Sequence, residues 1–528
     1  MVNLSGEQSF RLRTNLDFVA LRQRLRSEYG SSVQTEADID GIVSDVEKDL
    51  EDCDAEIDRL QSRILVLQNQ RRLLERYRTH SCSLRSPVRK IPNETVQQIF
   101  DYACGMNKLT SKKFRDMPTL TISNVCLRWR SLVKACPALW SRIHFKMESV
   151  PSHNFSVLDL YLESSQQSPL IIEITGKPEA LQPHHAAVCD ALVGHVNRWQ
   201  QLSVQGFEVY KSLTWHPRHY PALQRLLCPH LDLYPAGLED FKDAPQLCCL
   251  SVGFIPSVDL GEIQFPWKQL KLLAMGHHPS GMKNILDVCD KLTELQFQEV
   301  GIKPGSYELS LPPTMASVLE TLSLSVSQTG LSESLAEVVF SSMACPSLTS
   351  LLLEARNNYQ RPWPKKALCA FISRSSFNLT TLSIKFIPLS DADLIDLLHS
   401  LPSLLDLTID DSRLFATTAT KPSPITPRLI QSLHACPFDA SSVLVQKLQH
   451  LHMTFSGSSF NDGDFIDMVS SRWLSDNLDN FLDSGVGTVC LRSAVMCFKN
   501  REVDENIYRR LRHVEKAGMR VVGIGKSS

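Results

Sequence analysis

The chain has 528 residues, of which 43% are hydrophobic and 21% charged, a composition typical of a folded soluble protein with several domains or one long repeat array. Its formal net charge of -2 predicts no general attraction to nucleic acid or to an anionic membrane. No apolar run approaches the roughly 20 residues that a membrane helix needs, and no signal-peptide core follows Met1. We therefore expect a soluble protein of the cytoplasm, the nucleus or both.

The 15 cysteines are scattered and form no Cys-x-x-Cys pair, which excludes the usual zinc framework and the thioredoxin-like redox motif. Reduced cysteines inside a core are the interpretation that fits this pattern. The histidine pairs, such as His184 and His185, have no cysteine or carboxylate at metal-ligand spacing. We expect no metal site and no cofactor.

Residues 1–34 form an N-terminal segment with one short amphipathic stretch, Phe10 to Tyr29. Residues 35–78 are predicted to be a coiled-coil helix, because apolar residues alternate at spacings of three and four over five heptads. One core position is occupied by Val43, Leu50, Ile57 and Ile64, followed by Arg71, and the other by Ile39, Val46, Cys53, Leu60, Leu67 and Leu74.

The charge of this predicted helix is divided between its two halves. Between Glu36 and Asp58 there are eleven acidic residues against the single Lys48, whereas between Arg59 and Arg78 six arginines face one acid, Glu75. A parallel pair would bring like charges together, so an antiparallel self-association is the hypothesis favoured by electrostatics. A helix that folds back on its own protein, or that pairs with another chain, stays open as an alternative.

A basic connector, residues 79–90, leads into the segment 91–146, which contains three apolar clusters at helical spacing. Val96, Ile99 and Phe100 form the first, Val125, Trp129 and Leu132 the second, and Leu139 and Trp140 the third. Between Phe100 and Val125 lies a lysine-rich stretch from Gly105 to Pro118, which is predicted to be an inserted polar loop.

The order Pro92-x-Glu94, Ile99-Phe100, Val125-Cys126-x-x-Trp129-Arg130 and Pro137-x-Leu139-Trp140 resembles the F-box. This three-helix module binds the adaptor in SCF (Skp–cullin–F-box) ubiquitin ligases, and F-box-like proteins of fungi often place a coiled coil ahead of it. The resemblance implies adaptor contacts at Ile91, Pro92, Glu94, Val96, Ile99, Phe100, Val125, Trp129, Leu139 and Trp140. Among these we expect Pro92, Ile99 and Val125 to face the adaptor and Trp129 to be partly structural.

Residues 147–528 are predicted to be a leucine-rich-repeat-like domain. Phe155 to Leu160 and Pro169 to Ile174 have the pattern of strands. A triad of large apolar residues then recurs at intervals of 22 to 31 residues, with one longer interval of 44 that contains an insertion from Phe415 to Pro427. The nine triads start at Trp199, Leu247, Leu270, Leu292, Leu319, Leu348, Leu379, Leu404 and Leu448, and a partial copy starts at Leu223.

Helical spacing between the triads, as at Leu394, Leu397 and Leu398, predicts one strand and one helix per unit, the architecture of a solenoid. The final stretch, from Val486 to Ile524, is predicted as strand, helix (Asp504 to Lys516) and strand. The fold class expected is therefore multidomain, α and then α/β: a coiled-coil helix, a three-helix F-box and a strand–helix solenoid. An irregular α/β domain is the alternative to the solenoid.

The family resemblance implies a substrate receptor that docks on a Skp-type adaptor, and through it on cullin, and holds an unknown target protein on the repeats. An interaction scaffold that joins no ligase is the alternative. No catalytic motif is found, so we expect no enzyme activity and no catalytic residues. Positions between the repeat leucines are candidates for target contact, namely Glu294, Gln296, Thr321, Ser323, Thr381 and Ser383.

Overall fold

The computed structural model describes residues 11–26, 33–149, 156–176, 182–214, 219–232, 235–254, 260–276, 282–299, 314–328, 334–356, 359–413, 423–435, 444–457, 460–473, 490–516 and 518–525. The chain is a mixed α/β protein with a long N-terminal helix and a large parallel sheet. It divides into two compact units, the first ending at Val96 and the second beginning at Gln97. The sheet belongs entirely to the second unit.

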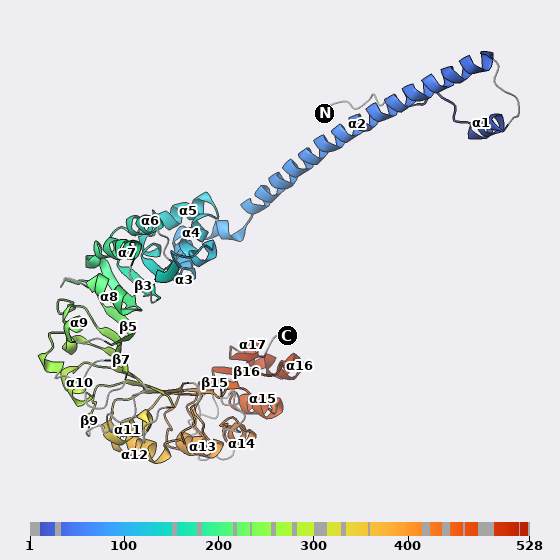
Figure 1. The fold of residues 1–528 in the computed structure, drawn as a ribbon. Coiled ribbons are helices and arrows are strands. Elements are labelled where there is room, and N and C mark those ends of the chain that lie inside the picture. Colours follow the sequence, from blue (N-terminus) through green and yellow to red (C-terminus); the bar gives the residue numbers. More distant parts are fainter. Residues whose placement is uncertain are drawn as a thin grey trace. The chain divides into compact units, whose positions relative to one another are not determined.

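The first unit consists mainly of α2 (Val33–Leu84), a continuous helix of 52 residues that confirms the helix predicted from the heptads (Figure 1). A short helix, α1 (Phe18–Leu25), precedes it. The backbone N–H groups of Arg13 and Thr14 donate to the carboxylate of Asp49 at 3.0 and 2.8 Å, so the N-terminal segment is tied to α2 at that turn. Whether α2 pairs with a second helix stays a prediction.

Among the described residues of the second unit, fifteen parallel strands follow one another across a single sheet in chain order, except that β9 and β11 form a separate pair. Strictly parallel neighbours need a crossover between each pair of strands, which the intervening helices and turns provide. The strands are β1 (Asn107–Lys108), β2 (Arg142–Lys146), β3 (Leu170–Thr175), β4 (Trp199–Val204), β5 (Arg225–Asp232), β6 (Cys249–Phe254), β7 (Leu272–Gly276), β8 (Glu294–Gln298), β10 (Thr321–Val326), β12 (Ser350–Ala355), β13 (Thr381–Lys385), β14 (Asp406–Asp410), β15 (His450–Phe455), β16 (Ser493–Phe498) and β17 (Arg520–Ile524), with β9 (Thr314–Met315) and β11 (Met343–Ala344) apart.

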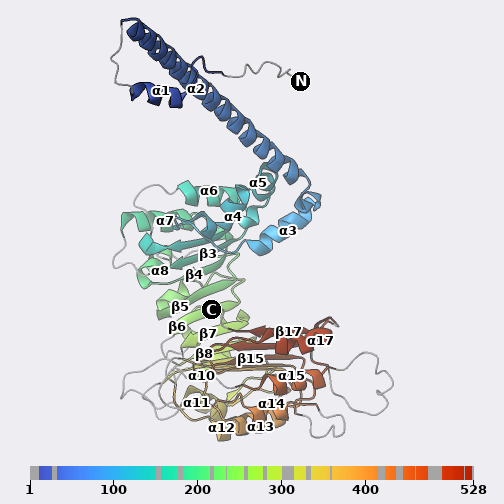
Figure 2. The ribbon, with the colours of Figure 1, turned by 90° about the vertical axis from the view of Figure 1, so that its right-hand side faces the viewer.

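Helices lie along one side of this sheet (Figures 1 and 2). They bury apolar faces, as α11 does with Leu335, Val338 and Val339. The α-helices of the second unit, beginning with the one that crosses its boundary, are α3 (Asn93–Ala103), α4 (Pro118–Ser123), α5 (Leu127–Lys134), α6 (Ser156–Ser164), α7 (Pro183–Val193), α8 (Phe207–Thr214), α9 (Pro235–Glu239), α10 (Met282–Val288), α11 (Leu335–Ser342), α12 (Lys365–Ser375), α13 (Asp391–His399), α14 (Pro427–Ser432), α15 (Asp462–Ser471), α16 (Glu505–Tyr508) and α17 (Arg512–Lys516).

The core of the sheet is a row of leucines that we call the leucine ladder. The strand pairings place the central residue of each predicted triad directly beside that of the next strand, and every member is at most 2% exposed. Truncating such a buried leucine to alanine costs about 2–5 kcal/mol. The ladder consists of Leu202, Leu226, Leu250, Leu273, Leu295, Leu322, Leu351, Leu382, Leu407 and Leu451.

Two local predictions are wrong, and a third is confirmed in part. Phe155 to Leu160 was expected to be a strand, but Ser156–Ser164 is helix α6, because Leu158, Tyr161 and Leu162 are buried at helical spacing. The expected third helix at Leu139 and Trp140 is a 3₁₀ turn, Pro137–Leu139, that leads into β2. The predicted C-terminal helix is interrupted by a 3₁₀ turn between α16 and α17.

The stretch from Gly105 to Pro118 is also not simply the polar loop that was predicted. It contains β1, a 3₁₀ turn (Phe114–Asp116) and the start of α4, the helix that replaces the expected third one. The strand at Pro169 to Ile174 is confirmed as β3 and the last strand as β17. Val486 and Val489 lie outside the described residues, as does most of the predicted insertion, residues 415–422.

Two buried charged groups hold the long stretch of chain that connects β14 to β16. The guanidinium of Arg472 is fully buried and donates to the carbonyl oxygens of Leu433, Leu444 and Val445, on both sides of residues 436–443. The carboxylate of Asp411, also fully buried, accepts hydrogen bonds from the hydroxyl of Ser423 and from the backbone N–H of Ser456 at 2.9 Å. Both groups replace water with protein partners, as buried charges must.

Burial raises the pKa of Asp411 to about 6, above its usual 3.8, although its hydrogen bonds oppose that shift. The folded state therefore binds a proton more tightly than the unfolded state, and its stability falls as the pH rises from about 4 to about 6. We predict that Asp411→Asn, which keeps the shape and the acceptor oxygen, stabilises the chain by up to about 3 kcal/mol at pH 7.5. Thermal unfolding of both proteins across this range measures the effect, which should vanish near pH 4. A gain that is independent of pH would contradict this account.

Candidate functional site

The packing of two helices in the second unit brings the centre of the F-box-like motif together. Phe100 on α3 is 2% exposed, and its ring meets the indole of Trp129 on α5 edge to face, with centroids 4.9 Å apart. Such aromatic pairs add about 0.5–1.5 kcal/mol beyond the area that they bury. This contact fixes α3 against α5.

The C-terminal end of α3 is held by Arg142 at the start of β2. One guanidinium nitrogen, Nη1, donates to the carbonyl oxygens of Asp101 and Cys104 at 3.1 and 2.6 Å, while Nη2 pairs with the Asp101 carboxylate. A cation at this end satisfies free carbonyls and complements the helix dipole. The helix is therefore anchored directly to the first strands of the sheet.

Asn107 on β1 explains why the lysine-rich stretch is folded. Its side chain is completely buried and uses all of its polar atoms: Nδ2 donates to the carbonyls of Leu139 and Arg142 at 3.1 and 3.0 Å. Its Oδ1 accepts from the backbone N–H of Thr119 and from the hydroxyl of Tyr161, both at 3.1 Å. One side chain thus connects β1, α4, α6 and the turn before β2.

Around this packed centre, five large apolar side chains point into solvent. Their exposed fractions run from 48% to 92%. They come from α3, from the turn before α4, from the connection between α4 and α5, and from the first residue of α5. We call Ile99, Tyr102, Phe114, Val125 and Leu127 the exposed apolar set.

The ten residues predicted to bind the adaptor divide by burial. Pro92, Glu94, Ile99 and Val125 are exposed, Ile91 and Trp129 are half-buried, and the remainder are buried. The buried ones are Val96, Phe100, Leu139 and Trp140, of which Trp140 donates from its indole N–H to the carbonyl of Val133 at 3.0 Å. Ile91, Pro92, Glu94 and Val96 belong to the first compact unit and the other six to the second.

Sequence reasoning missed Tyr102, Phe114 and Leu127. Tyr102 follows Ile99 by three residues, so helical spacing alone could have placed both on the same side of α3. Phe114 lies in the stretch that was predicted to be a polar loop. Leu127 is the first residue of α5, and no periodic pattern in the sequence distinguishes it from a core residue.

The six predicted target-contact residues lie in two rows on the sheet face opposite the helices. Register pairs Glu294 with Thr321 and Gln296 with Ser323, and the same rows reach Thr381 and Ser383 two strands further on. Side chains alternate between faces along a strand, so a buried leucine ladder leaves these positions on the other face. All are half-buried except Ser383, which is 9% exposed.

The same rows lead to a shallow hollow of about 350 Å³ over β14 to β17. Its lining mixes charges of both signs with imidazole, hydroxyl and thiol groups. The polar side chains in it are Asp406, Thr408, His450, His452, Ser493, Cys497 and Arg520. The sequence prediction stopped short of this hollow because it named residues only on β8, β10 and β13.

Within the hollow, the Sγ of Cys497 lies 3.8 Å from the Nε2 of His452. A cysteine nucleophile needs a thiolate, normally made by a nearby base or cation. Burial instead raises the pKa of Cys497, and burial also lowers the pKa of His452, so both groups are neutral near pH 7. The pair has the residue types of a catalytic dyad but not its electrostatics.

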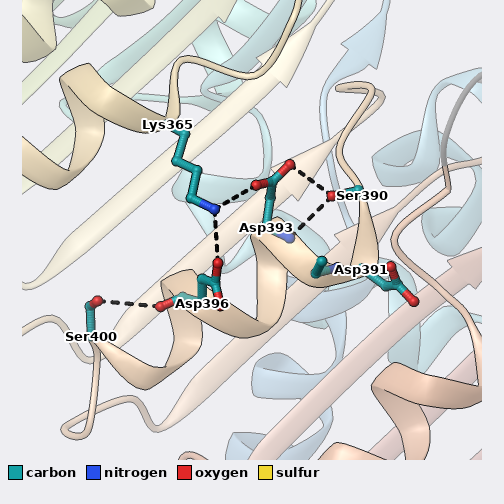
Figure 3. Close-up of polar contacts among 7 residues, drawn as sticks. Lys365, Ser390, Asp391, Asp393, Asp396 and Ser400 are labelled. Atoms are coloured by element: carbon teal, nitrogen blue, oxygen red, sulfur yellow. Dashed lines mark hydrogen bonds and ion pairs between the residues drawn. The ribbon is translucent and has the colours of Figure 1, made fainter.

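A second polar cluster is a lysine clamp between consecutive helices (Figure 3). Lys365 at the start of α12 donates to the carboxylates of Asp396 and Asp393 on α13 at 2.8 and 2.9 Å. These hydrogen bonds raise the pKa of Lys365 further above its usual range, so it stays an ammonium ion and cannot act as a nucleophile. Ser390 caps α13 by accepting from the backbone N–H of Asp393 at 3.1 Å. The cluster joins the consecutive helices α12 and α13.

Among the residues that the structure describes, no three His, Cys, Asp or Glu side chains are placed to hold a metal ion. None of the described helices combines the length and apolar character needed to cross a membrane. No protein-family model and no curated protein sequence matches this chain. The exposed apolar set and the open face of the sheet are therefore the two candidate binding surfaces of the described residues.

We predict that Asn107→Asp disrupts the region around the exposed apolar set. The change removes both amide donors and leaves a carboxylate in a site with no solvent, which destabilises by about 3–5 kcal/mol. Hydrogen exchange measured by mass spectrometry should show lost protection in α4 and β1, while strands of the leucine ladder stay protected.

Asn124→Asp makes the same chemical change at an exposed position beside α4 and serves as the matched control. Equal loss of protection in both variants, or in neither, would contradict the role assigned to Asn107.

Proposed function

We propose that this protein is a substrate-receptor subunit of an SCF-type ubiquitin ligase. The exposed apolar set, carried on α3, the turn before α4, the connection between α4 and α5, and the start of α5, docks on a Skp-type adaptor, which links the chain to cullin. The observation that supports this most strongly is the exposure of Ile99 and Val125, at 48% and 58%, within a segment whose motif order resembles the F-box.

Interface energetics favour this assignment. Binding energy concentrates in a few large apolar or aromatic side chains that become fully desolvated on association. Tyr102 at 92% exposure and Leu127 at 77% have the most area to lose to a partner. The neighbouring Phe100 and Trp129 support the surface from within, which is the arrangement that keeps such anchors rigid.

The second unit supplies the receptor surface in this proposal. The leucine ladder, in register over ten consecutive strands, supports assigning residues 147–528 to a leucine-rich-repeat-like solenoid. The half-buried polar rows on the face opposite the helices, together with the hollow over β14 to β17, are the candidate contact area for a target protein. Their mixed polarity fits a protein surface of both charge signs.

Catalysis belongs to the partners in this proposal. The chain holds a target near the ubiquitin-loaded enzyme, and proximity of this kind can lower a barrier by several kcal/mol without any catalytic side chain in the receptor. We accordingly propose no enzyme activity, no cofactor and no direct contact with nucleic acid or membrane, and a place in the cytoplasm, the nucleus or both.

A scaffold outside any ligase is the second candidate function. It is favoured by the stretch between Phe100 and Val125, which contains a strand of the large sheet and the buried hub Asn107. This stretch integrates the helical segment with the sheet more closely than an independent docking module requires. Failure to bind any Skp-type adaptor would favour this candidate.

We predict that Ile99→Asp combined with Val125→Asp weakens adaptor binding at least 100-fold, because each substitution puts a charge where an apolar contact is desolvated. The measurement is titration calorimetry of the purified full-length chain against a Skp-type adaptor. Circular dichroism should remain unchanged, since both residues are largely exposed.

Val318→Asp is the matched control: Val318 is 44% exposed and lies among the predicted repeats, so the same change should leave affinity intact. Full affinity in the double variant, or an equal loss in the control, would refute the assigned surface.

A further inference from the structure

The long helix α2 exposes an apolar stripe between Ile39 and Leu74. At the heptad core positions, eight side chains have exposed fractions of 47% to 69%, although these are the residues that a folded protein normally buries. A helix of this length gains most of its stability from packing such a stripe against a partner. The eight are Ile39, Val43, Leu50, Ile57, Leu60, Ile64, Leu67 and Leu74.

We propose that α2 pairs with α2 of a second copy of this chain as an antiparallel coiled coil, with the two-fold axis between Asp58 and Arg59. The occupant of the stripe is thus another molecule of the same protein. The proposal does not depend on the function proposed above, because it concerns only the first compact unit.

Charge selects the antiparallel direction. Residues 36–58 are acidic and residues 59–78 are basic, so antiparallel helices lay each acidic half beside a basic half. In a parallel pair, the flanking positions would place Asp49 next to Asp54 of the other helix, and the acidic halves would repel along their length. The ion pairs already present involve only part of this charge: Glu56 pairs with Arg59 and Arg71 with Glu75 in the same helix, and Arg13 pairs with Asp49 and Asp52.

Core packing selects the register. In an antiparallel coiled coil, residues at one heptad core position of the first helix face residues at the other core position of the second helix. Leu50 then meets Leu67 of the second copy, and Ile57 meets Leu60 of the second copy. In this alignment the symmetry axis coincides with the point where the charge of the helix changes sign. A shift by one heptad moves the axis into the acidic or the basic half and brings like charges together.

The same register produces a favourable flanking pair. Glu56 lies beside Arg63 of the second copy, and symmetry repeats the contact on the other side of the axis. Glu56 already lies 2.6 Å from Arg59 in its own helix, so Arg63 would complete a three-charge network. Exposed ion pairs contribute little singly, and a network of several charges is the arrangement in which they do contribute.

The chain's own N-terminal segment is the competing occupant. Arg13 pairs with Asp52 at 2.6 Å and reaches Asp49, which is only 6% exposed. Near these contacts, Val46 and Cys53 at one heptad core position are half-buried. At the other core position, Val43, Leu50 and Ile57 keep 49% to 60% of their surface exposed. In the described part of the chain, the polar contacts of this segment with α2 fall on Asp49 and Asp52, in the acidic half. The described part of the segment, residues 11–26, therefore leaves most of the stripe exposed.

The pairing has a geometric consequence for the assembly. From the axis to Leu84 is about 25 residues, so at 1.5 Å per residue the two helix C-termini lie about 75 Å apart. The residues that follow Leu84 in the two copies therefore leave the coiled coil at its opposite ends.

The test uses full-length chains that carry Ile57→Cys or Leu60→Cys, each with a different affinity tag. Facing core positions bring their Cβ atoms within disulfide range, so mild oxidation should link position 57 to position 60 only when the two variants are mixed. Mass spectrometry identifies the linked peptides, and sedimentation of the wild-type chain should give twice 59.4 kDa.

Linkage of 57 to 57, of 60 to 60, or of native Cys53 to Cys53 would indicate a parallel pair and overturn the proposal. A chain that stays monomeric at high concentration would also overturn the proposal. A dimer that persists in the double variant Leu50→Asp, Leu67→Asp would do the same, because its interface would lie outside the stripe of α2. A monomer that dimerises only after removal of residues 1–26 would identify the N-terminal segment as the occupant and equally overturn it.

Discussion

The in-register burial of one leucine per strand is the constraint on which the second unit depends. Leu202 lies beside Leu226, and the ladder continues strand by strand to Leu451, so each leucine is covered by those on either side. Because side chains alternate along a strand, this register also decides which residues reach the open face. The polar rows that end in the hollow near Arg520 are thus a direct consequence of the packing on the opposite face. A one-residue slip would exchange the two faces and lose both.

Much of this architecture follows from the sequence because the triads repeat a pattern that one strand of a parallel sheet requires. The triad pattern does not predict a strand where a smaller residue replaces the central leucine. In β16 this residue is Ala494, which pairs with Leu451. The pattern also fails where a single polar side chain decides the fold. The stretch from Gly105 to Pro118 has the composition of a loop, yet it is folded through the four hydrogen bonds of Asn107 and the pairing of β1 with β2.

The candidate site was harder to predict, since core and interface residues share the same helical spacing. Ile99 and Phe100 are neighbours in one motif, yet Ile99 is 48% exposed while Phe100 is 2% exposed and meets Trp129. Only the packing of α3 on α5 separates these two roles. The hollow is a stronger example, because His452 and Cys497 are far apart in sequence and meet only through the pairing of β15 with β16. No local motif could have indicated that contact.

The most direct test of the account is hydroxyl-radical footprinting of the full-length chain with and without a Skp-type adaptor. Tyr102 and Leu127, at 92% and 77% exposure, react readily when free and should become strongly protected in the complex, together with Ile99. Val318 and the open face of the sheet should keep their reactivity, leaving that face for a target protein. Protection of the sheet face with Tyr102 and Leu127 still reactive would contradict the account.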